Sequence, residues 1–319
     1  MFPWLLVLGA AIPPLAVVGL AASRLRGEPQ APTLRRVGTA MYAGSTISVV
    51  SAILLETLLP LLVLSLVVSL GSVVRDFLHD LTRGTFAGRP IEALTQPGAL
   101  AFLAVLAVIA PLVEEFVKPI GVWVLNRRIP NAAHALLVGM ACGAGFAIIE
   151  NILYESVGHR AWAGVVLVRG VGAALHPLGA GLVSLGWYAV YTGAPDRWRT
   201  WWRCFGAAVG IHALWNAASG IFALLEAERF AGEAPWQLDL YGMPISLFLI
   251  FFLVAQGVLM LGGVVILAER VKTMGAVEPA APMPIRNPQR ALALWALACL
   301  ALLLPIGLSA IRAILAALA

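Results

Sequence analysis

The chain contains a series of long apolar runs, each at least as long as the stretch that crosses a lipid bilayer. About 20 helical residues span the hydrocarbon of a bilayer. Only helices and closed barrels satisfy their backbone hydrogen bonds there. The sequence therefore predicts an all-α, polytopic integral membrane helical bundle of about eight transmembrane helices. The expected spans lie at about residues 2–22, 38–74, 101–125, 135–154, 162–191, 204–225, 244–268 and 291–311.

Composition supports a single transmembrane domain over residues 1–319, whose motif-bearing core is residues 99–225. Apolar residues make up 61% of the chain and charged residues only 12%, whereas soluble domains carry about 25% charged residues. The net charge of +5 arises from arginines in short loops between apolar spans. It therefore indicates membrane topology, and we expect the lipid bilayer and not nucleic acid as a partner.

The distribution of positive charge predicts the orientation. One set of alternate loops carries thirteen Arg or Lys residues and the other set carries five. Because positively charged loops stay in the cytoplasm, the first set is predicted to be cytoplasmic and both termini to lie outside. The cytoplasmic set comprises residues 23–37, 126–134, 193–203 and the Pro-rich linker 269–290.

The run from residue 38 to residue 74 is longer than one crossing requires. It is either one long kinked helix or a lead-in followed by a span, and Glu56 and Pro60 interrupt it. Glu56 either lines a cavity shared with other polar residues or merely breaks an overlong helix. In the segment that follows, Phe77, Leu78 and Leu81 recur at helical spacing among charged residues, which predicts an amphipathic helix at the membrane interface.

Three charged residues lie together inside the third span: Glu114, Glu115 and Lys118. At about 100° per residue, Lys118 lies about 40° round the helix from Glu114 and about 60° from Glu115. The lysine keeps one carboxylate ionised, while burial and the like charge favour protonation of the other. Two carboxylates of unequal acidity suit general acid–base chemistry. The alternative is a structural ion pair, which does not account for the surplus glutamate.

The fourth span carries Phe146 and, one helical turn later, Glu150 followed by Asn151. Upstream, three glycines form a small-residue face that lets a neighbouring helix approach closely. We therefore expect Glu150 to reach a residue on an adjacent span. The alternative is a carboxylate that extends toward water at the membrane surface.

Two histidines lie near the centres of the fifth and sixth spans. His176 is followed by Pro177 and has Arg169 seven residues earlier on its own face; His212 has Asn216 one turn later. A lone membrane histidine is usually a hydrogen-bonding residue between helices. Here both histidines fall at the depth of the glutamate pair, so we expect a single shared site.

These residues resemble the motif series of the PrsW-type intramembrane proteases, which belong to the wider group of the CAAX prenyl endopeptidases. The series runs over residues 111–216 as Glu114-Glu115-x-x-Lys118, Phe146-x-x-x-Glu150-Asn151, His176 and His212-x-x-x-Asn216. The CAAX branch has an arginine one place after the lysine position and a histidine where Glu150 stands. The chain therefore resembles PrsW more closely, and prenylated substrates are not expected.

The resemblance implies a protease in a bacterial plasma membrane that cleaves a membrane-embedded or membrane-proximal protein, such as a single-span or anti-sigma-like substrate. The residues then take roles in peptide hydrolysis. Glu114 or Glu115 is the base, with the other partnered by Lys118, and Asn216 donates to the oxyanion. The histidines polarise the carbonyl, hold the water or bind a metal.

Whether the site needs a divalent metal such as zinc stays open at this point, with Glu150, His176 and His212 as candidate ligands. Histidines and carboxylates suit zinc, but the HExxH spacing of soluble zinc proteases is absent. Two other classes of function also remain. A proton- or ion-coupled transporter keeps ionisable residues at mid-membrane, and a non-catalytic membrane scaffold can retain the same fold.

Overall fold

The computed structural model describes most of the chain as far as Met274. The described residues are 3–26, 32–62, 67–83, 85–86, 89–125, 129–157, 162–230, 239–240 and 243–274. The predicted eighth span, most of the predicted linker and the Arg127–Arg128 turn lie outside these ranges.

The described chain is almost entirely helical, apart from one short antiparallel pair of strands. The helices are α1 (Pro3–Arg24), α2 (Leu34–Ala43), the π-helical η1 (Gly44–Ser48), α3 (Val49–Leu62), α4 (Val67–Thr82), α5 (Pro90–Thr95), α6 (Pro97–Ala104), the π-helical η2 (Val105–Ile109), α7 (Ala110–Val117), α8 (Ile120–Leu125), α9 (Ala132–Val157), α10 (Trp162–Val171), α11 (Leu175–Tyr191), α12 (Arg197–Phe230) and α13 (Ile245–Lys272). The strands are β1 (Asp239–Leu240) and β2 (Met243–Pro244).

Seven helical segments of the described chain are long and apolar enough to cross a membrane. This confirms the predicted all-α polytopic bundle, and each of the first seven predicted spans has a counterpart. The segments are Val7–Arg24, Leu34–Glu56, Pro97–Val117, Ala132–Ser156, Trp162–Tyr191, Arg197–Leu225 and Ser246–Lys272.

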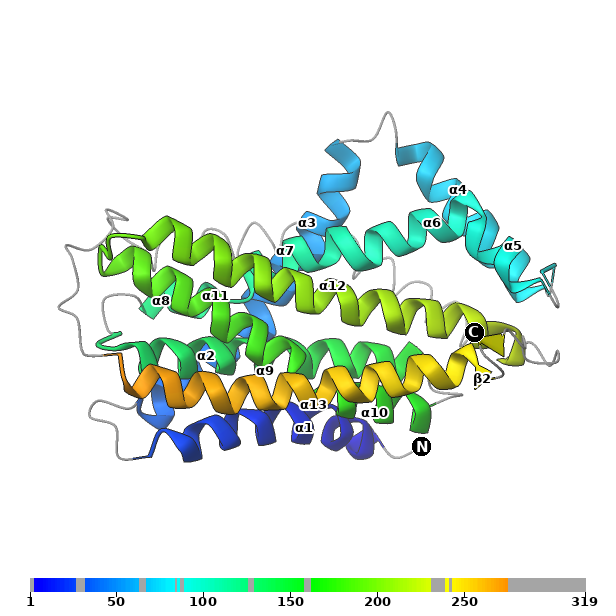
Figure 1. The fold of residues 1–319 in the computed structure, drawn as a ribbon. Helices are drawn as coiled ribbons and strands as arrows, with labels where there is room; N and C mark the ends of the chain where they lie inside the picture. Colours follow the sequence, from blue (N-terminus) through cyan, green and yellow to red (C-terminus); the bar gives the residue numbers. More distant parts are fainter. Residues whose placement is uncertain are drawn as a thin grey trace, which may run out of the picture.

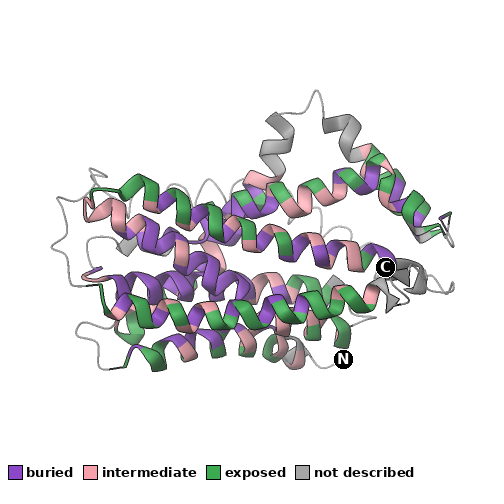
Figure 2. Cartoon of the chain, viewed as in Figure 1, coloured by how far each residue is buried: buried purple, intermediate pink, exposed green. Residues whose placement is uncertain are grey.

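Helix α9 lies at the centre of the bundle. In its most apolar stretch 89% of the residues are buried, against at most 50% in any other span of the described chain. It packs against α1, α2 and α11, and α11 packs in turn against α12 (Figure 1). Figure 2 shows buried residues concentrated on these central helices, while α13 and α1 carry exposed residues outward. Residues on α9 are therefore shielded from lipid on most sides.

The predicted small-residue face on α9 is confirmed for Gly139 and Gly143, whereas Gly145 lies on a different side of the helix. Gly139 and Gly143 pack on α11, where a Cβ at Gly143 would lie 2.1 Å from the carbonyl oxygen of His176. Gly145 faces the other side, where a Cβ would lie 2.0 Å from the carbonyl oxygen of Met41. Because no side chain intervenes, α11 brings His176 directly against the helix that carries Glu150.

Two spans that were expected to be unbroken helices, 101–125 and 162–191, are interrupted. The first breaks at Lys118–Pro119, between α7 and α8, and the second at residues 172–174, between α10 and α11. Proline has no N–H and its ring clashes with the preceding turn, so a proline inside a helix tends to kink or end it. Pro119 accounts for the first break, and the second break places Pro177 in the first turn of α11.

The choice between the two arrangements considered for the run from residue 38 to residue 74 depends on residues 63–66, which lie outside the described chain. A helix interrupted only by the π-helical turn η1 runs from Leu34 to Leu62, and α4 begins at Val67. The predicted amphipathic helix is present in α4, where Phe77 and Leu81 are 5% and 3% exposed. Its apolar face packs on α6 and on the end of α12, so it contacts protein, whereas Leu78 is exposed.

Candidate active site

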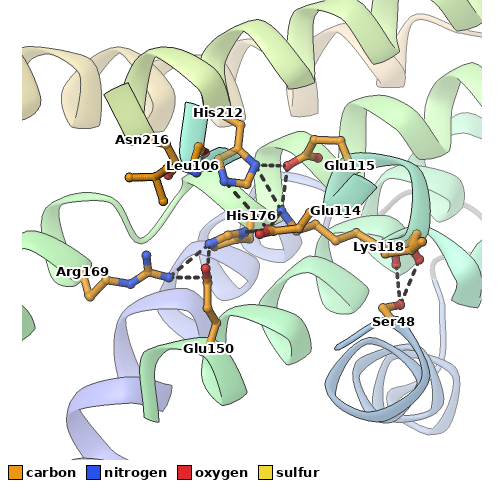
Figure 3. A network of polar contacts seen from close by, with 11 residues as sticks. Ser48, Leu106, Glu114, Glu115, Lys118, Glu150, Arg169, His176, His212 and Asn216 are labelled. Atoms are coloured by element: carbon orange, nitrogen blue, oxygen red, sulfur yellow. Dashed lines mark hydrogen bonds and ion pairs between the residues drawn. The ribbon is translucent and has the colours of Figure 1, made fainter. Parts of the chain in front are cut away.

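The predicted glutamate–lysine face forms a buried ion-pair cluster at the end of α7 (Figure 3). The Lys118 Nζ atom lies 2.7 Å from Glu115 Oε1 and 2.9 Å from Glu114 Oε2. The side chains of Lys118 and Glu115 are fully buried, and that of Glu114 is 8% exposed. The helical spacing therefore predicted these contacts correctly. One lysine balances two carboxylates, which leaves one negative charge for other partners.

A serine on a distant segment holds the end of α7 in place. The hydroxyl of Ser48, the last residue of η1, donates to the carbonyl oxygens of Val117 (3.0 Å) and Lys118 (3.2 Å). Carbonyls at a helix end lack intrahelical partners, and Pro119 stops the helix at this point. Ser48 thus satisfies carbonyl groups that the break exposes, and it helps to fix Lys118 at the site.

His212, on α12, is oriented by Glu115. Its Nδ1 atom lies 2.8 Å from Glu115 Oε1 and 3.4 Å from Lys118 Nζ. An ionised carboxylate only accepts hydrogen bonds, so Nδ1 carries the proton and donates to Glu115. The lone pair of His212 is then on Nε2, which lies 3.8 Å from Glu114 Oε2.

His176, in the first turn of α11, is oriented in the same way by Glu150. Its Nε2 atom lies 2.7 Å from Glu150 Oε2, so we assign the ring proton to Nε2. Its Nδ1 atom is buried without a hydrogen-bond partner in the described chain and lies 3.9 Å from Glu114 Oε2. Both histidines therefore turn an unprotonated nitrogen toward Glu114.

Arg169, near the end of α10, holds Glu150. Its Nη2 atom lies 2.5 Å from Glu150 Oε2 and 3.2 Å from His176 Nε2, and its Nε atom donates to the side chain of Asn151. Its guanidinium also lies over the ring of Tyr154. The sequence placed Arg169 on the face of His176 without giving it a role.

Phe146, the aromatic residue of the second motif, packs between His176 and Lys118. Its ring centroid lies 5.5 Å from that of His176 and 4.8 Å from the Lys118 ammonium. A cation over an aromatic face is stabilised by about 0.5–2 kcal/mol. The rings of His176 and His212 meet edge to face, with centroids 5.2 Å apart. Phe146 thus restricts the positions of both Lys118 and His176.

The structure brings six of the seven predicted site residues into contact with one another, whereas Asn216 contacts the backbone of another helix. Its Nδ2 atom donates to the carbonyl oxygen of Leu106 at 2.9 Å. Leu106 lies in η2, where the π-helical turn disturbs the usual hydrogen-bond pattern. Asn216 therefore ties α12, which carries His212, to the helix that leads to Glu114. Its predicted role toward an oxyanion stays a prediction.

Gly179 is required at the site but was not predicted. A Cβ at this position on α11 would lie 2.4 Å from Glu115 Oε2, so only glycine leaves room for the carboxylate. The sequence alone contains no signal for this role, because Gly179 lies 64 residues from Glu115 in the chain. Helix α11 contains other glycines, and nothing in the sequence distinguishes Gly179 from them.

Glu114, His176 and His212 form a group that fits a divalent metal ion. One potential ligand atom of each lies within 4.8 Å of the other two, and all three residues are buried. A tetrahedral ion with bonds of about 2.0–2.1 Å separates its ligand atoms by roughly 3.4 Å. The 3.8 Å and 3.9 Å separations from Glu114 Oε2 are close to that value.

The surrounding contacts support the same ligand set. Metal-binding histidines usually donate their second ring N–H to a carboxylate, which fixes the orientation of the ring. Glu115 and Glu150 stand in these positions for His212 and His176. The carboxylate that faces both free nitrogens is thus Glu114, whereas the sequence had suggested Glu150 as a ligand; Glu150 contacts the opposite nitrogen of His176.

Fold and site together define a polytopic membrane protein with a buried centre of carboxylates, histidines and a lysine, suited to hydrolysis. Comparison with known families assigns the chain more specifically: residues 32–255 match the PrsW family of intramembrane metalloproteases. This match covers more than half of the chain, so the chain belongs to that family and is a protease, a hydrolase. No curated protein and no solved structure matches the chain.

Proposed function

We propose that the chain hydrolyses a peptide bond in a single-span or membrane-proximal protein substrate, at a centre formed by Glu114, His176 and His212. The observation that carries this proposal is the pairing of each histidine with its own carboxylate. Glu115 and Glu150 hold one nitrogen of His212 and His176, respectively, at 2.8 Å and 2.7 Å. Each histidine therefore presents its other nitrogen to Glu114.

In this proposal, Glu114, His176 and His212 hold a divalent ion such as zinc. When bound there, such an ion supplies Lewis acidity that polarises the scissile carbonyl. Glu115 is fully buried and engaged by both Lys118 and His212, so it acts as the residue that orients His212. Glu114 and Glu115 were first considered as the base. In this proposal Glu114 holds the ion and Glu115 holds His212, so neither is left free to accept a proton.

The exposure of the side chains indicates the direction from which substrate arrives. Lys118 and Glu115 are fully buried, while Glu150 and Arg169 are 17% and 13% exposed. Access is therefore expected on the Glu150–Arg169 side, and the Lys118 side forms the closed end. A substrate of such a protease is already held at the bilayer, so a small opening on this side is enough for it to reach the site.

The test is cleavage of candidate single-span substrates by the purified protein in liposomes, with and without a chelator. We expect cleavage that chelation stops and that zinc or cobalt restores. Glu114→Gln should lose both cleavage and most of its affinity for Co²⁺, followed by absorption spectroscopy. A Glu114→Gln protein that cleaves at the wild-type rate, or that binds Co²⁺ as tightly, contradicts the proposal.

A further inference from the structure

The carboxylates described so far are all committed to partners. Glu114 pairs with Lys118 and faces both histidines. Glu115 pairs with Lys118 and His212, and Glu150 with Arg169 and His176. Peptide hydrolysis also requires a group that takes a proton from water and delivers one to the leaving nitrogen. All three are held in these ion pairs, which points to a carboxylate outside them for this step.

Glu56 lies on the face of α3 that packs against the site. Val49 and Ala52 of α3 are buried in one cluster with residues of α7 and with Phe146 of α9. Glu56 follows Ala52 by four residues and Val49 by seven, so it lies on the same helical face, one turn further along. This face points to the place where α7 and α9 meet, which is where their glutamates lie.

The position of Glu56 along α3 agrees with this. Ser48, which immediately precedes α3, bonds to the carbonyl of Lys118, so α3 begins at the level of the ion-pair cluster. Eight residues later, Glu56 is about 12 Å further along the helix axis, one turn beyond Ala52, which packs with α7 and α9. Electrostatic interaction with Glu114, Glu150 and Lys118 is consistent with this place. Glu56 therefore faces the polar cluster and does not merely interrupt the helix.

Glu56 differs from the other glutamates of the site in having no ion-pair partner in the described chain. Its Oε1 atom is buried without a hydrogen bond. A buried polar atom left unsatisfied lowers the stability of the folded protein. Groups kept in this state in a native structure often serve catalysis. A carboxylate that has unused acceptor atoms and lies beside a hydrolytic centre is suited to accept a proton and to donate it again.

Resting on the function proposed above, we propose that Glu56 is the proton-transfer residue of the hydrolysis. The water oxygen forms a bond to the scissile carbonyl carbon as its proton passes to the Glu56 carboxylate. The carbon–nitrogen bond then breaks, and the same proton passes to the leaving nitrogen. The products are a carboxylic acid and an amine, and Glu56 returns to its ionised form. No oxidant or second reactant is required.

The first test compares two buried glutamates in the full-length protein. Glu56→Gln should lower kcat on a cleaved reporter by about 10²-fold or more, with KM little changed, because general acid–base groups contribute about 10²–10⁴-fold. Glu155→Gln is the matched control. Glu155 is fully buried on α9 and accepts a hydrogen bond from Trp162, outside the site. Glu155→Gln should retain activity, and a Glu56→Gln protein that does the same overturns the inference.

Binding of Co²⁺ separates this inference from the proposed function. Glu56→Gln should bind Co²⁺ within about twofold of the wild-type affinity, whereas His212→Gln should bind it at least tenfold more weakly, because only His212 is a ligand. Weak Co²⁺ binding by Glu56→Gln would make Glu56 a ligand and overturn its proton-transfer role. A wild-type protein that binds Co²⁺ but cleaves nothing overturns both proposals.

Two further measurements exclude a purely structural effect. An ester in place of the scissile amide needs less protonation of its leaving group, so Glu56→Gln should lose at least tenfold less activity on the ester. Equal losses on both substrates contradict the proposal. If the Gln variant does not fold, Glu56→Asp and Glu56→Asn provide a matched pair with and without the carboxylate. Equal rates for this pair would also overturn the proposal.

Discussion

Removing the Lys118 charge should destabilise the protein far more than removing the Glu115 charge. Lys118→Met leaves two buried carboxylates, Glu114 and Glu115, without their nearest cation. Leaving a buried ion without its partner typically costs about 3–5 kcal/mol. In Glu115→Gln, by contrast, Lys118 keeps Glu114 at 2.9 Å, and the Gln oxygen still accepts from His212. We expect a cost of about 1 kcal/mol there, the value of one typical hydrogen bond.

The assay is thermal unfolding in one detergent, with cleavage of a reporter measured on the same samples. A change of 1 kcal/mol shifts Tm by about 2–4 °C in larger domains, so Lys118→Met should unfold roughly 10 °C lower. Glu115→Gln should unfold within a few degrees of wild type. It should nevertheless lose about 10–100-fold in activity, the usual effect of changing a residue that orients a metal ligand.

A double variant completes the comparison. Lys118→Met combined with Glu115→Gln removes one positive and one negative charge together, so it should unfold at a higher temperature than Lys118→Met alone. The ion-pair account is wrong if Lys118→Met is as stable as wild type. It is equally wrong if Glu115→Gln is the less stable of the two single variants.

Three other outcomes follow from the described contacts. Gly179→Ala should lower activity at least tenfold, because its Cβ would meet Glu115, whereas Gly206→Ala on α12 faces open space and should be neutral; equal activities contradict this. Asn216→Ala should lower stability by about 1–3 kcal/mol by leaving the Leu106 carbonyl unpaired; unchanged stability with lost turnover would favour the oxyanion role. A single cysteine at Thr200 should resist impermeant reagents added from outside, and labelling there would reverse the predicted topology.

Much of the site could be predicted because its decisive contacts lie within single helices or at one depth. Lys118 reaches Glu114 and Glu115 through spacings of four and three residues, which helix geometry fixes without tertiary information. His176 and His212 were placed with them by counting from the ends of their spans. Both methods need only the helical periodicity and the number of residues that cross a bilayer, so they work without tertiary information.

The identity of the carboxylate facing both histidines could not be predicted. Glu150 and Glu114 lie at similar depth, and the choice between them depends on how α9, α7 and α11 are rotated about their axes. That rotation is set by close contacts, such as that of Gly143 with the backbone of His176. Arg169 was placed on the face of His176, but its contact with Glu150 could not be predicted for a related reason, because it depends on how α10 packs against α9.

The interruptions of the helices and the position of the site have a common physical cause. Irregular backbone within the bilayer leaves polar groups that lipid cannot satisfy, so it persists only where protein or water supplies partners. In the described chain, Ser48 supplies a donor at the end of α7, and Asn216 supplies one at η2. Ser48 and Asn216, the polar residues that satisfy the backbone at these breaks, therefore lie on segments that also position Lys118 and His212. A purely structural bundle would not need such breaks, since unbroken helices satisfy their own backbone. Their concentration around one cluster of ionisable side chains favours a catalytic centre over a scaffold.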